Sequence, residues 1–394
     1  MAGYIRRAGV SQGVHDDIFV KTLVLDTEEL RLAIASFDLL GLDEHLYWNL
    51  CSAISQLLGP DTILIAVATH THSAPASAFQ SPLLTFGDDV YEEDYFQHVL
   101  GAFEQSAVEA EKNLSNAKMT FSAVKVEGVA TDREDPSRKI DDVATLLLFS
   151  LERGVRCGVL HYAVHPTVLG PENLLISRDL VGFAVDYIEK ALKVETCLFV
   201  NGAAGNVSTR FTRKEQSFGE AQRLGILLAE QVAKGYSLHS AGIQEEAKIW
   251  AIQNQLKLKM LSPQRKLVEA RAMVREWRGE ADRRMESLIE GIELLEKLSN
   301  IKEFPTSILV QASYLEIEET MKGVWLPFEL PASLPLKFKE MLGTHILISS
   351  YANGYYAYIA PEDAPSYERI FELLENMEKE KILELIEELL MQKF

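Results

Sequence analysis

The sequence predicts a mixed α/β (α+β) fold in which a largely buried central sheet is flanked by helices. Two short, continuous apolar runs, 63–68 (ILIAVA) and 197–200 (CLFV), have the length and composition of buried strands. Amphipathic helical patterns occur close to them in the chain, at 43–58 and 216–234. The chain shows no internal repeat, low-complexity tract or Pro/Gly/Ser-rich linker. Buried strands that alternate with helices are typical of this fold class.

Further strands follow from local patterns. The runs 18–25 and 31–37 are rich in β-forming residues and are joined by a short polar turn, so they predict a hairpin. Two more β-rich runs, 143–150 and 157–164, flank a turn at 153–154 and predict another pair of strands.

The chain changes character after residue 260. Apolar residues recur there at steps of three, four or seven, which predicts either a long amphipathic helix or a helical hairpin broken near Gly279 or Gly291. We assign 264–299 as a helical insert within a single domain that spans 1–394. The insert either covers the mouth of a site or serves as a packing element or a face for homo-oligomer formation. The last predicted elements are two strands and an acidic C-terminal helix: 307–315, 344–350 and 366–392.

The composition excludes several classes of protein. The 394 residues are 47% apolar, and 58 acidic against 39 basic residues give a formal net charge of −19. A nucleic-acid-binding protein would show basic clusters, and an anionic membrane would not attract so acidic a chain. No apolar run approaches the roughly 18 residues that a transmembrane helix needs. The first residues lack the apolar core of a signal peptide, and three widely spaced cysteines suit a reducing compartment, so we expect a cytoplasmic protein.

Two histidines follow the apolar run 63–68 directly. His70 and His72 are two residues apart, so in an extended segment their side chains point to the same side. Ligands in open α/β sheets bind at the carboxyl ends of strands, which is where this segment lies. The pair could share a metal ion, or one histidine could bind metal while the other moves a proton. Two polar residues of an ordinary surface loop are the alternative.

Two further polar segments follow predicted strands. His161 and His165 share one strand face, and the later one lies at the strand end. The segment 201–210 (NGAAGNVSTR) follows the run 197–200, and its small residues permit a tight turn and a close backbone approach to a ligand. It lacks both the P-loop and the Rossmann patterns. If the three strands are parallel neighbours, all three loops converge on one edge of the sheet.

Taken together, these segments resemble the neutral/alkaline (non-lysosomal) ceramidase family in its N-terminal catalytic domain. The chain is identified as a short, bacterial or archaeal-type member of that family. The matching segments are ordered along most of the chain: 2–4 with 13–16, 69–73 (THTHS), Arg133 in TDREDP, 163–165 with 177–179, 205–208 (GNVS), 327–329 (PFE) and 353–355 (NGY).

The resemblance implies a zinc-dependent hydrolase that cleaves an amide (N-acyl) bond. The family's single zinc ion is held by two His, one Glu and one Tyr, which correspond here to His70, His165, Glu329 and Tyr355. Zinc favours histidine nitrogen and carboxylate oxygen, and a catalytic site leaves a position for water.

The resemblance also implies catalytic roles for four more residues. His72 corresponds to the general base and acid, and its unperturbed pKa of about 6.5 suits that work. Arg133 and Tyr367 correspond to groups that stabilise a developing oxyanion and orient substrate. Ser208 matches a serine that the family requires, either as nucleophile or to position the substrate.

The departures from the family pattern fall in loops expected to contact the substrate. Asn206 stands where the family often has Asp, and Arg178 replaces Gly in Ser-Gly-Asp. Three functions therefore stay open. The first is hydrolysis of a ceramide-like lipid amide, the second is hydrolysis of a small soluble N-acyl or peptide-like amide, and the third is a non-catalytic protein with a relic metal site.

Overall fold

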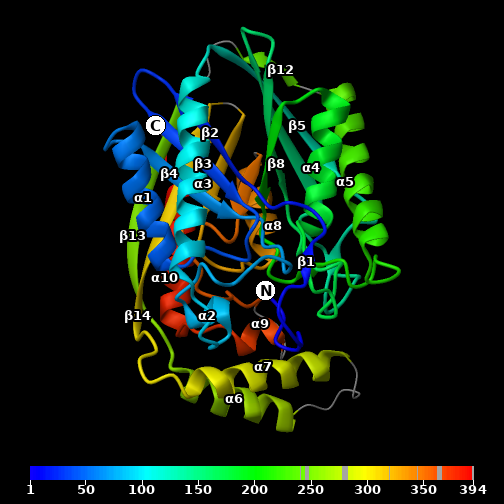
Figure 1. Ribbon diagram of the computed structural model, residues 1–394, viewed down its shortest axis with the longest axis vertical. Helices are drawn as coiled ribbons and strands as arrows, with labels where there is room; N and C mark the ends of the chain where they lie inside the picture. Colours follow the sequence, from blue (N-terminus) through cyan, green and yellow to red (C-terminus); the bar gives the residue numbers. More distant parts are fainter. Residues whose placement is uncertain are drawn as a thin grey trace.

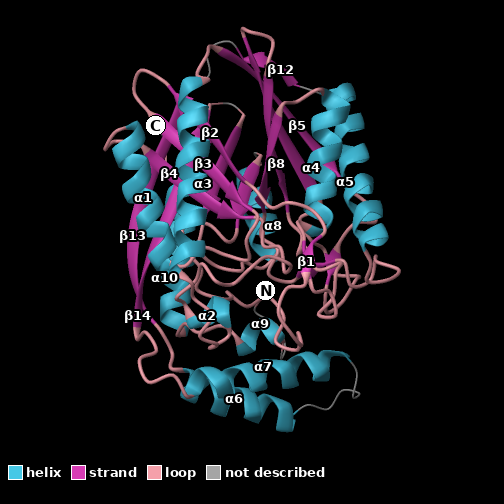
Figure 2. Ribbon diagram, in the orientation of Figure 1, coloured by secondary structure: helices cyan, strands magenta, loops and turns pink. Residues whose placement is uncertain are grey.

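In the protein, two layers of β-sheet pack face to face, and helices cover their outer faces (Figure 1). The computed structural model describes residues 1–239, 241–244, 248–276, 283–318, 320–343, 345–361 and 366–392. Figure 2 shows strands at the centre of the molecule and helices around them. The predicted mixed α/β class is confirmed, with packed sheets in place of one central sheet.

The first layer is a five-stranded sheet in the order β10-β8-β7-β5-β12. Its strands β10 and β8 are parallel, and the other neighbours are antiparallel. Helices α4 and α5 cover its outer face through a continuous apolar cluster. The bounds of these elements are β5 Ala117–Lys125, β7 Val143–Leu151, β8 Arg156–Tyr162, β10 Thr196–Asn201, β12 Ala241–Gln244, α4 Asp179–Leu192 and α5 Phe218–His239.

The second layer contains a three-stranded sheet in the order β2-β3-β4. The strands β2 (Val20–Asp26) and β3 (Arg31–Phe37) form the predicted hairpin, and β4 (Ile63–Ala68) is parallel to β3. Alternate residues of β3 face opposite sides, so that Ile34 packs between the sheets and Ala35 packs under the helices. Those helices are α1 (Glu44–Leu58) and α3 (Glu93–Lys112).

A four-stranded sheet, in the order β13-β14-β15-β16, continues this layer beyond β4. The side-chain amide of Gln253 donates to the Leu64 carbonyl (2.6 Å), and a bridge joins Val67 to Ala352. The second strand of this sheet matches the predicted run 307–315, and the last one matches the run 344–350. The bounds are β13 Ile249–Lys259, β14 Ser307–Ile317, β15 Met321–Trp325 and β16 Ile346–Ser349.

The three predicted site loops come together, but not along one sheet edge. β8 and β10 are parallel neighbours, as expected, whereas β4 belongs to the other layer. The layers meet close to the strand ends, where the Ser36 hydroxyl of β3 donates to the Phe199 carbonyl of β10 (2.6 Å). Packing between sheets, rather than strand pairing, therefore brings the loop after β4 to the other two.

The region 264–299 is a helical hairpin. Helix α6 (Pro263–Glu276) packs beside α7 (Arg283–Ser299) at one end of the molecule (Figure 1). The expected break at Gly279 lies outside the described residues, and Gly291 lies inside α7. The single C-terminal helix predicted for 366–392 is wrong, because α9 (Tyr367–Ile370) and α10 (Asn376–Met391) are separate helices.

Short elements complete the described part of the chain. They are β1 Gly13–Val14, β6 Thr131–Asp132, β9 Leu175–Ile176, β11 Val207–Ser208, α2 Pro82–Thr85 and α8 Ser333–Leu342. β1 pairs with β9, and β11 pairs with β6. None of the described helices has the length and hydropathy that crossing a bilayer would require.

Candidate metal centre and active site

Three histidines meet where the strands β4, β8 and β10 finish. One ring nitrogen from each of His70, His72 and His165 lies within 4.8 Å of the others. The Nδ1 atoms face backbone carbonyls: His70 faces Leu40 (2.6 Å), His165 faces Ala204 (2.7 Å) and His72 faces Gly3 (2.8 Å). A carbonyl only accepts, so each Nδ1 donates a proton, and in a neutral ring Nε2 is then the atom that carries the lone pair.

One asparagine ties the three strand ends together. The side-chain amide of Asn201, the last residue of β10, donates to the carbonyls of Thr69 (3.0 Å) and Val164 (2.9 Å). These acceptors immediately precede His70 and His165 in the chain. Asn201 therefore fixes the spacing between the two histidines, although the sequence pattern did not single it out for that role.

The backbone of the site is held in an uncommon conformation. His70 has a φ of 68° and Tyr351 a φ of 57°, in the left-handed region that residues with a Cβ rarely adopt. Such strain persists only where the surroundings enforce it, and it clusters at functional sites. Gly3 permits a close approach, since a Cβ there would lie 2.5 Å from Cγ of His72.

Glu329 and Tyr355 lie at the same point as the histidines. Oε2 of Glu329 lies 3.1 Å from Nε2 of His165 and 3.6 Å from Nε2 of His70. The Tyr355 hydroxyl donates to Oε1 of Glu329 over 2.5 Å. Tyr351, which sequence reasoning missed, stacks on the His70 ring at 3.8 Å between centroids, and its hydroxyl donates to Oε2 of Glu329 (3.3 Å).

Burial determines the charge state of this cluster. It lowers the pKa of His70 to about 3, and burial together with the neighbouring imidazoles lowers the pKa of His72 well below 6.5. Burial opposes ionisation of Glu329, but the contacts with His70, His165 and Tyr355 outweigh it and lower the pKa of this carboxyl. At neutral pH His70 and His72 are therefore neutral imidazoles and Glu329 is a carboxylate, the forms that bind metal ions.

The cluster fits a bound cation. Nε2 of His165 is buried without a hydrogen-bond partner among the described residues, yet it faces a carboxylate oxygen at 3.1 Å. Nε2 of His72 likewise lies 3.2 Å from Nε2 of His70. Acceptors held this close in a buried site require a proton or a cation between them. Imidazole nitrogen combined with carboxylate oxygen is a donor set that suits zinc.

Arg133 and Tyr367 form a second group close to the cluster. Nε of Arg133 donates to Oε1 of Glu368 over 2.6 Å. The guanidinium carbon lies 5.4 Å from the Tyr358 ring centre and 5.2 Å from that of Tyr367. Burial alone would lower the pKa of Arg133, but the Glu368 carboxylate outweighs it and raises that pKa. Arg133 is therefore a fixed cation, with Nη2 buried and without a hydrogen-bond partner in the described chain.

Ser208 lies beside the cluster through its backbone. It forms a β-bridge with His165, and its hydroxyl accepts a hydrogen bond from the backbone N–H of Arg210 (3.2 Å). Within the described ranges, no histidine or carboxylate is hydrogen-bonded to this hydroxyl. His161, four residues before His165, is buried in β8 and is not a member of the cluster.

A small pocket of about 40 Å³ opens onto His70 and His72. Tyr355, Tyr358 and Tyr367 line one part of it, and apolar side chains line the rest. Those side chains include Leu83, Phe86, Leu294 and Leu298. Since Leu294 and Leu298 belong to α7, the helical insert forms part of the wall next to the histidines.

Comparison with known proteins supports the sequence resemblance. The family model described as neutral/alkaline non-lysosomal ceramidase, N-terminal, matches residues 1–216, which is more than half of the chain. The chain belongs to this family. The neutral ceramidases of Drosophila pseudoobscura pseudoobscura and Drosophila melanogaster are 26% and 25% identical to it over 207 residues. Each match covers 48% of this chain and 29% of the relative, so the chain matches less than a third of the length of these ceramidases.

Solved ceramidase structures share the fold. The crystal structure of neutral ceramidase from Pseudomonas aeruginosa matches with a TM-score of 0.74 and 15% identity, over 99% of this chain and 71% of that chain. A structure described as ceramidase complexed with C2 gives the same TM-score and identity, over 99% of this chain and 72% of that chain. At this identity the likeness concerns the fold alone.

Both departures from the ceramidase pattern have local partners. The amide of Asn206 donates to Oδ2 of Asp132 (2.6 Å), a contact that a second carboxylate would not make. Arg178 forms two hydrogen bonds of 2.9 Å with the carboxylate of Asp186, and its backbone N–H donates to Oδ1 of Asp16 (2.9 Å). Each substitution is therefore matched by a carboxylate next to it.

Sequence reasoning missed Tyr351, Tyr358 and Glu368. The density of tyrosines at 351–358 was a usable signal, since aromatic residues there closely follow the predicted strand 344–350. Glu368 gave no signal, because it lies in an acidic C-terminal segment where a single functional carboxylate does not stand out.

Proposed function

We propose that this ceramidase-family chain is a zinc-dependent amidohydrolase that cleaves an N-acyl bond, with ceramide-like lipids as the reference substrate. The observation that carries the proposal is the set of lone-pair donors that face one point: Nε2 of His70 and His165, and Oε2 of Glu329. Tyr355 completes the proposed metal site through its contact with Glu329. Zinc bound there would supply hydroxide at neutral pH, since water on catalytic zinc has a pKa of about 7.

The chain's own side chains would handle the proton and the substrate. His72 receives the proton of the attacking water at Nε2 and delivers it to the leaving amine, while its Nδ1–H stays on the Gly3 carbonyl. Arg133 and Tyr367 stabilise negative charge on the amide oxygen. Among the described residues, no base is hydrogen-bonded to the Ser208 hydroxyl, which favours a positioning role over a nucleophilic one.

A small soluble amide is the second candidate substrate class. The pocket beside His70 holds only about 40 Å³, far less than an extended acyl chain would occupy, which favours a small N-acyl or peptide-like amide over a long-chain lipid. Hydrolysis of a series of N-acyl sphingosines from C2 to C16, beside short soluble amides, separates the two. Turnover of short amides without turnover of ceramides would exclude the lipid substrate.

The acidic charge and the three free cysteines support a cytoplasmic enzyme. Such an enzyme would meet its lipid substrate in dispersed form, because a net charge of −19 disfavours docking on an anionic membrane. Whether it works as a homo-oligomer is a separate prediction, checked by light scattering.

Metal content and hydrolysis test the proposal together. We expect the wild type to hold about one zinc ion per chain, and His70→Ala, His165→Ala and Glu329→Gln to lose both metal and hydrolysis. His98 is exposed on α3, so His98→Gln is the matched histidine control and should retain both. A folded wild type that takes up no zinc, or that hydrolyses amides equally well without His70, would disprove the proposal and favour a non-catalytic protein.

A further inference from the structure

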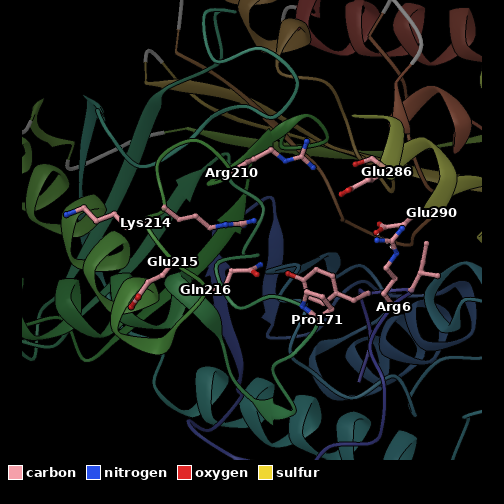
Figure 3. Close-up of a pocket in the computed structure, with 12 residues that line it drawn as sticks. Arg6, Pro171, Arg210, Lys214, Glu215, Gln216, Glu286 and Glu290 are labelled. Carbon is pink, nitrogen blue, oxygen red and sulfur yellow. Dashed lines mark ion pairs between the residues drawn. The ribbon is translucent and has the colours of Figure 1, made fainter. Parts of the chain in front are cut away.

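A second cavity, of about 520 Å³, adjoins the histidine site and is far larger than the pocket at the histidines. It lies between the segment 210–216, the N-terminal residues and α7 (Figure 3). Tyr4 lines it, and the Tyr4 ring centroid is 5.0 Å from that of His72. Arg210, on another wall, follows Ser208 by two residues and donates its backbone N–H to the Ser208 hydroxyl. Tyr4 therefore lies between this cavity and His72 of the histidine site.

The cavity has a cationic wall in an otherwise strongly acidic protein. Arg210 and Arg213 both line it, and Nη1 of Arg213 is held by the Thr167 carbonyl (2.7 Å). Nη1 of Arg210 donates to the carbonyl of Arg133 (3.1 Å), and this hydrogen bond fixes the position of the Arg210 guanidinium. Two fixed guanidinium groups on one wall form the arrangement that binds carboxylates and phosphates.

The acidic residues that line the cavity are paired with another residue, turned away or exposed. Glu290 pairs with Arg6 at 2.8 Å. Glu215 is exposed and turned away from the cavity in Figure 3, and its carboxylate accepts from the Ser217 hydroxyl (2.6 Å). Glu286, on α7, is exposed at the opposite side. Among the residues that line the cavity, Glu286 is therefore the carboxylate that remains opposite Arg210, while buried Asp179 interacts electrostatically with Arg213.

Arg210 lacks a carboxylate partner of its own. In the parts of the chain that the structure describes, no carboxylate lies within ion-pair distance of its guanidinium. Burial, and after it the charge of Arg133, lowers the pKa of Arg210; Arg213 adds to this effect, whereas Glu134 and Glu368 oppose it. A half-buried cation whose charged form is disfavoured by burial is stabilised when an anion binds beside it.

We propose that the amide substrate carries an anionic group, a carboxylate or a phosphate, which binds to Arg210 and Arg213 in this cavity while the amide lies at the histidines. This inference rests on the proposed function and gives it a substrate class: anionic N-acyl compounds rather than neutral ceramide. In the reaction, water supplies OH to the acyl carbon and H to the nitrogen as the C–N bond breaks, and the anionic group stays unchanged.

Matched pairs of substrates test the charge directly. The probes are N-lauroyl-glycine and N-lauroyl-6-aminohexanoate against their carboxamides, and ceramide 1-phosphate against ceramide. We expect the zinc-loaded wild type to prefer the anionic member of at least one pair by tenfold or more in kcat/KM. Which pair shows the preference distinguishes carboxylate from phosphate recognition.

Variants of the cationic wall assign the preference to Arg210. Arg210→Met should reduce the ratio of anionic to neutral kcat/KM by roughly tenfold to a hundredfold, the size expected for one charge-assisted hydrogen-bonded contact. Lys214 also borders the cavity, but its side chain is exposed and points away from it (Figure 3). Lys214→Met removes the same charge and should leave the ratio unchanged.

Equilibrium binding separates failure of this inference from failure of the proposed function. Calorimetry with the preferred anionic probe and its neutral partner is run on the metal-free full chain, where no hydrolysis interferes. If no amide is hydrolysed but the anionic probe still binds through Arg210, the proposed function fails and the anion site stands. Two results would overturn the anion site. One is an equal kcat/KM of the wild type for both members of every pair. The other is a ratio of anionic to neutral kcat/KM in Arg210→Met that equals the wild-type ratio.

Discussion

Asn206 donates a hydrogen bond from Nδ2 to Oδ2 of Asp132, over 2.6 Å, and its Oδ1 accepts one from the backbone N–H of Ala332 over 2.8 Å. The backbone of the same residue accepts from the N–H of Arg133 (2.8 Å). One buried amide therefore joins the turn that carries Arg133 to the segment that follows Glu329. The family pattern often has Asp at this position, so the chain has exchanged an acceptor for a donor where a carboxylate faces it.

Restoring the family residue should harm this protein. Asn206→Asp would place two carboxylates at hydrogen-bond distance in a buried site. We expect a loss of about 3 kcal/mol or more in the free energy of unfolding at neutral pH, the cost typical of an uncompensated buried charge. Denaturant unfolding measures it. The loss should shrink as the pH falls, because one of the two carboxyls then takes up a proton and can donate.

Exchanging the two residues provides the matched control. In Asp132→Asn combined with Asn206→Asp, the amide and the carboxylate change places and one donor again faces one acceptor. This double variant should be clearly more stable than Asn206→Asp alone. A double variant as unstable as the single one would show that the pairing does not set the stability here.

A second prediction concerns the close approach of Gly205 to the metal-site carboxylate. A Cβ at Gly205 would lie 2.8 Å from the backbone oxygen of Glu329, too close for either backbone to remain in place. Gly205→Ala should therefore displace Glu329, weaken zinc binding measured by chelator competition, and cost about 1–3 kcal/mol of stability.

Gly101 is the control for this substitution. It lies in α3 with nothing within 4 Å of an added Cβ, so Gly101→Ala should leave zinc binding unchanged and add about 0.5–1 kcal/mol to the stability. Equal zinc affinity in the two alanine variants would contradict the proposed position of Glu329 in the metal site.

A third prediction is a pH dependence at the N-terminal segment. Burial opposes ionisation of Asp16, but the backbone N–H of Arg178 and the Ser177 hydroxyl outweigh it and lower the pKa of this carboxyl below 3.8. Because the native pKa is the lower one, the stabilisation is present above the unfolded value and is lost as the pH falls through the native value. Asp16→Asn should therefore destabilise the protein at pH 7 and make little difference in strong acid.

Urea titrations of both proteins across this pH range measure the effect. We expect a difference of about 1.5 kcal/mol at pH 7, the size of a hydrogen bond to a charged group. A difference that stays constant down to the acid limit would mean that Asp16 acts through packing and not through its charge.

The sequence located the histidine site because the signal was local. His70 and His165 each follow a run of apolar residues closely, and the carboxyl ends of strands place such residues at a common site. Periodicity could not show that β4 pairs in a different sheet from β8, since an apolar run does not encode its partner. Residue-level reasoning could not find Glu329 either: the family resemblance supplied it, and its carboxylate reaches His165 only through long-range packing.

The aromatic side of the site was harder to predict for a related reason. Tyr351 stacks on His70 because its own backbone and that of Asn353 adopt left-handed conformations. The Asn353 side chain stabilises that turn by accepting from the Ala66 N–H (3.1 Å), across 287 positions of the chain. A local sequence pattern cannot predict a turn that is stabilised by a residue so distant in the chain.

The last prediction concerns the carboxylate that holds Arg133. Glu368 is buried and accepts from Nε of Arg133 over 2.6 Å, so it fixes the guanidinium beside Tyr358 and Tyr367 without reaching the histidine cluster. Glu368→Gln keeps an oxygen for that hydrogen bond but removes the charge. We expect kcat to fall roughly tenfold to a hundredfold, as for other groups that orient a catalytic side chain, with KM little changed. Zinc content should stay at the wild-type level, because none of the proposed ligands contacts Glu368.

Glu372 is the control for loss of a buried carboxylate in the same region. It pairs with Lys379 at 3.0 Å and accepts from the Ala360 N–H, so Glu372→Gln should lower the stability without a selective effect on kcat. If Glu368→Gln lowers only the stability, as Glu372→Gln is expected to do, then Glu368 serves the fold alone. If kcat falls while the zinc content and KM hold, Glu368 positions Arg133 for the reaction, and the acidic segment at the C-terminal end of the chain contributes to catalysis.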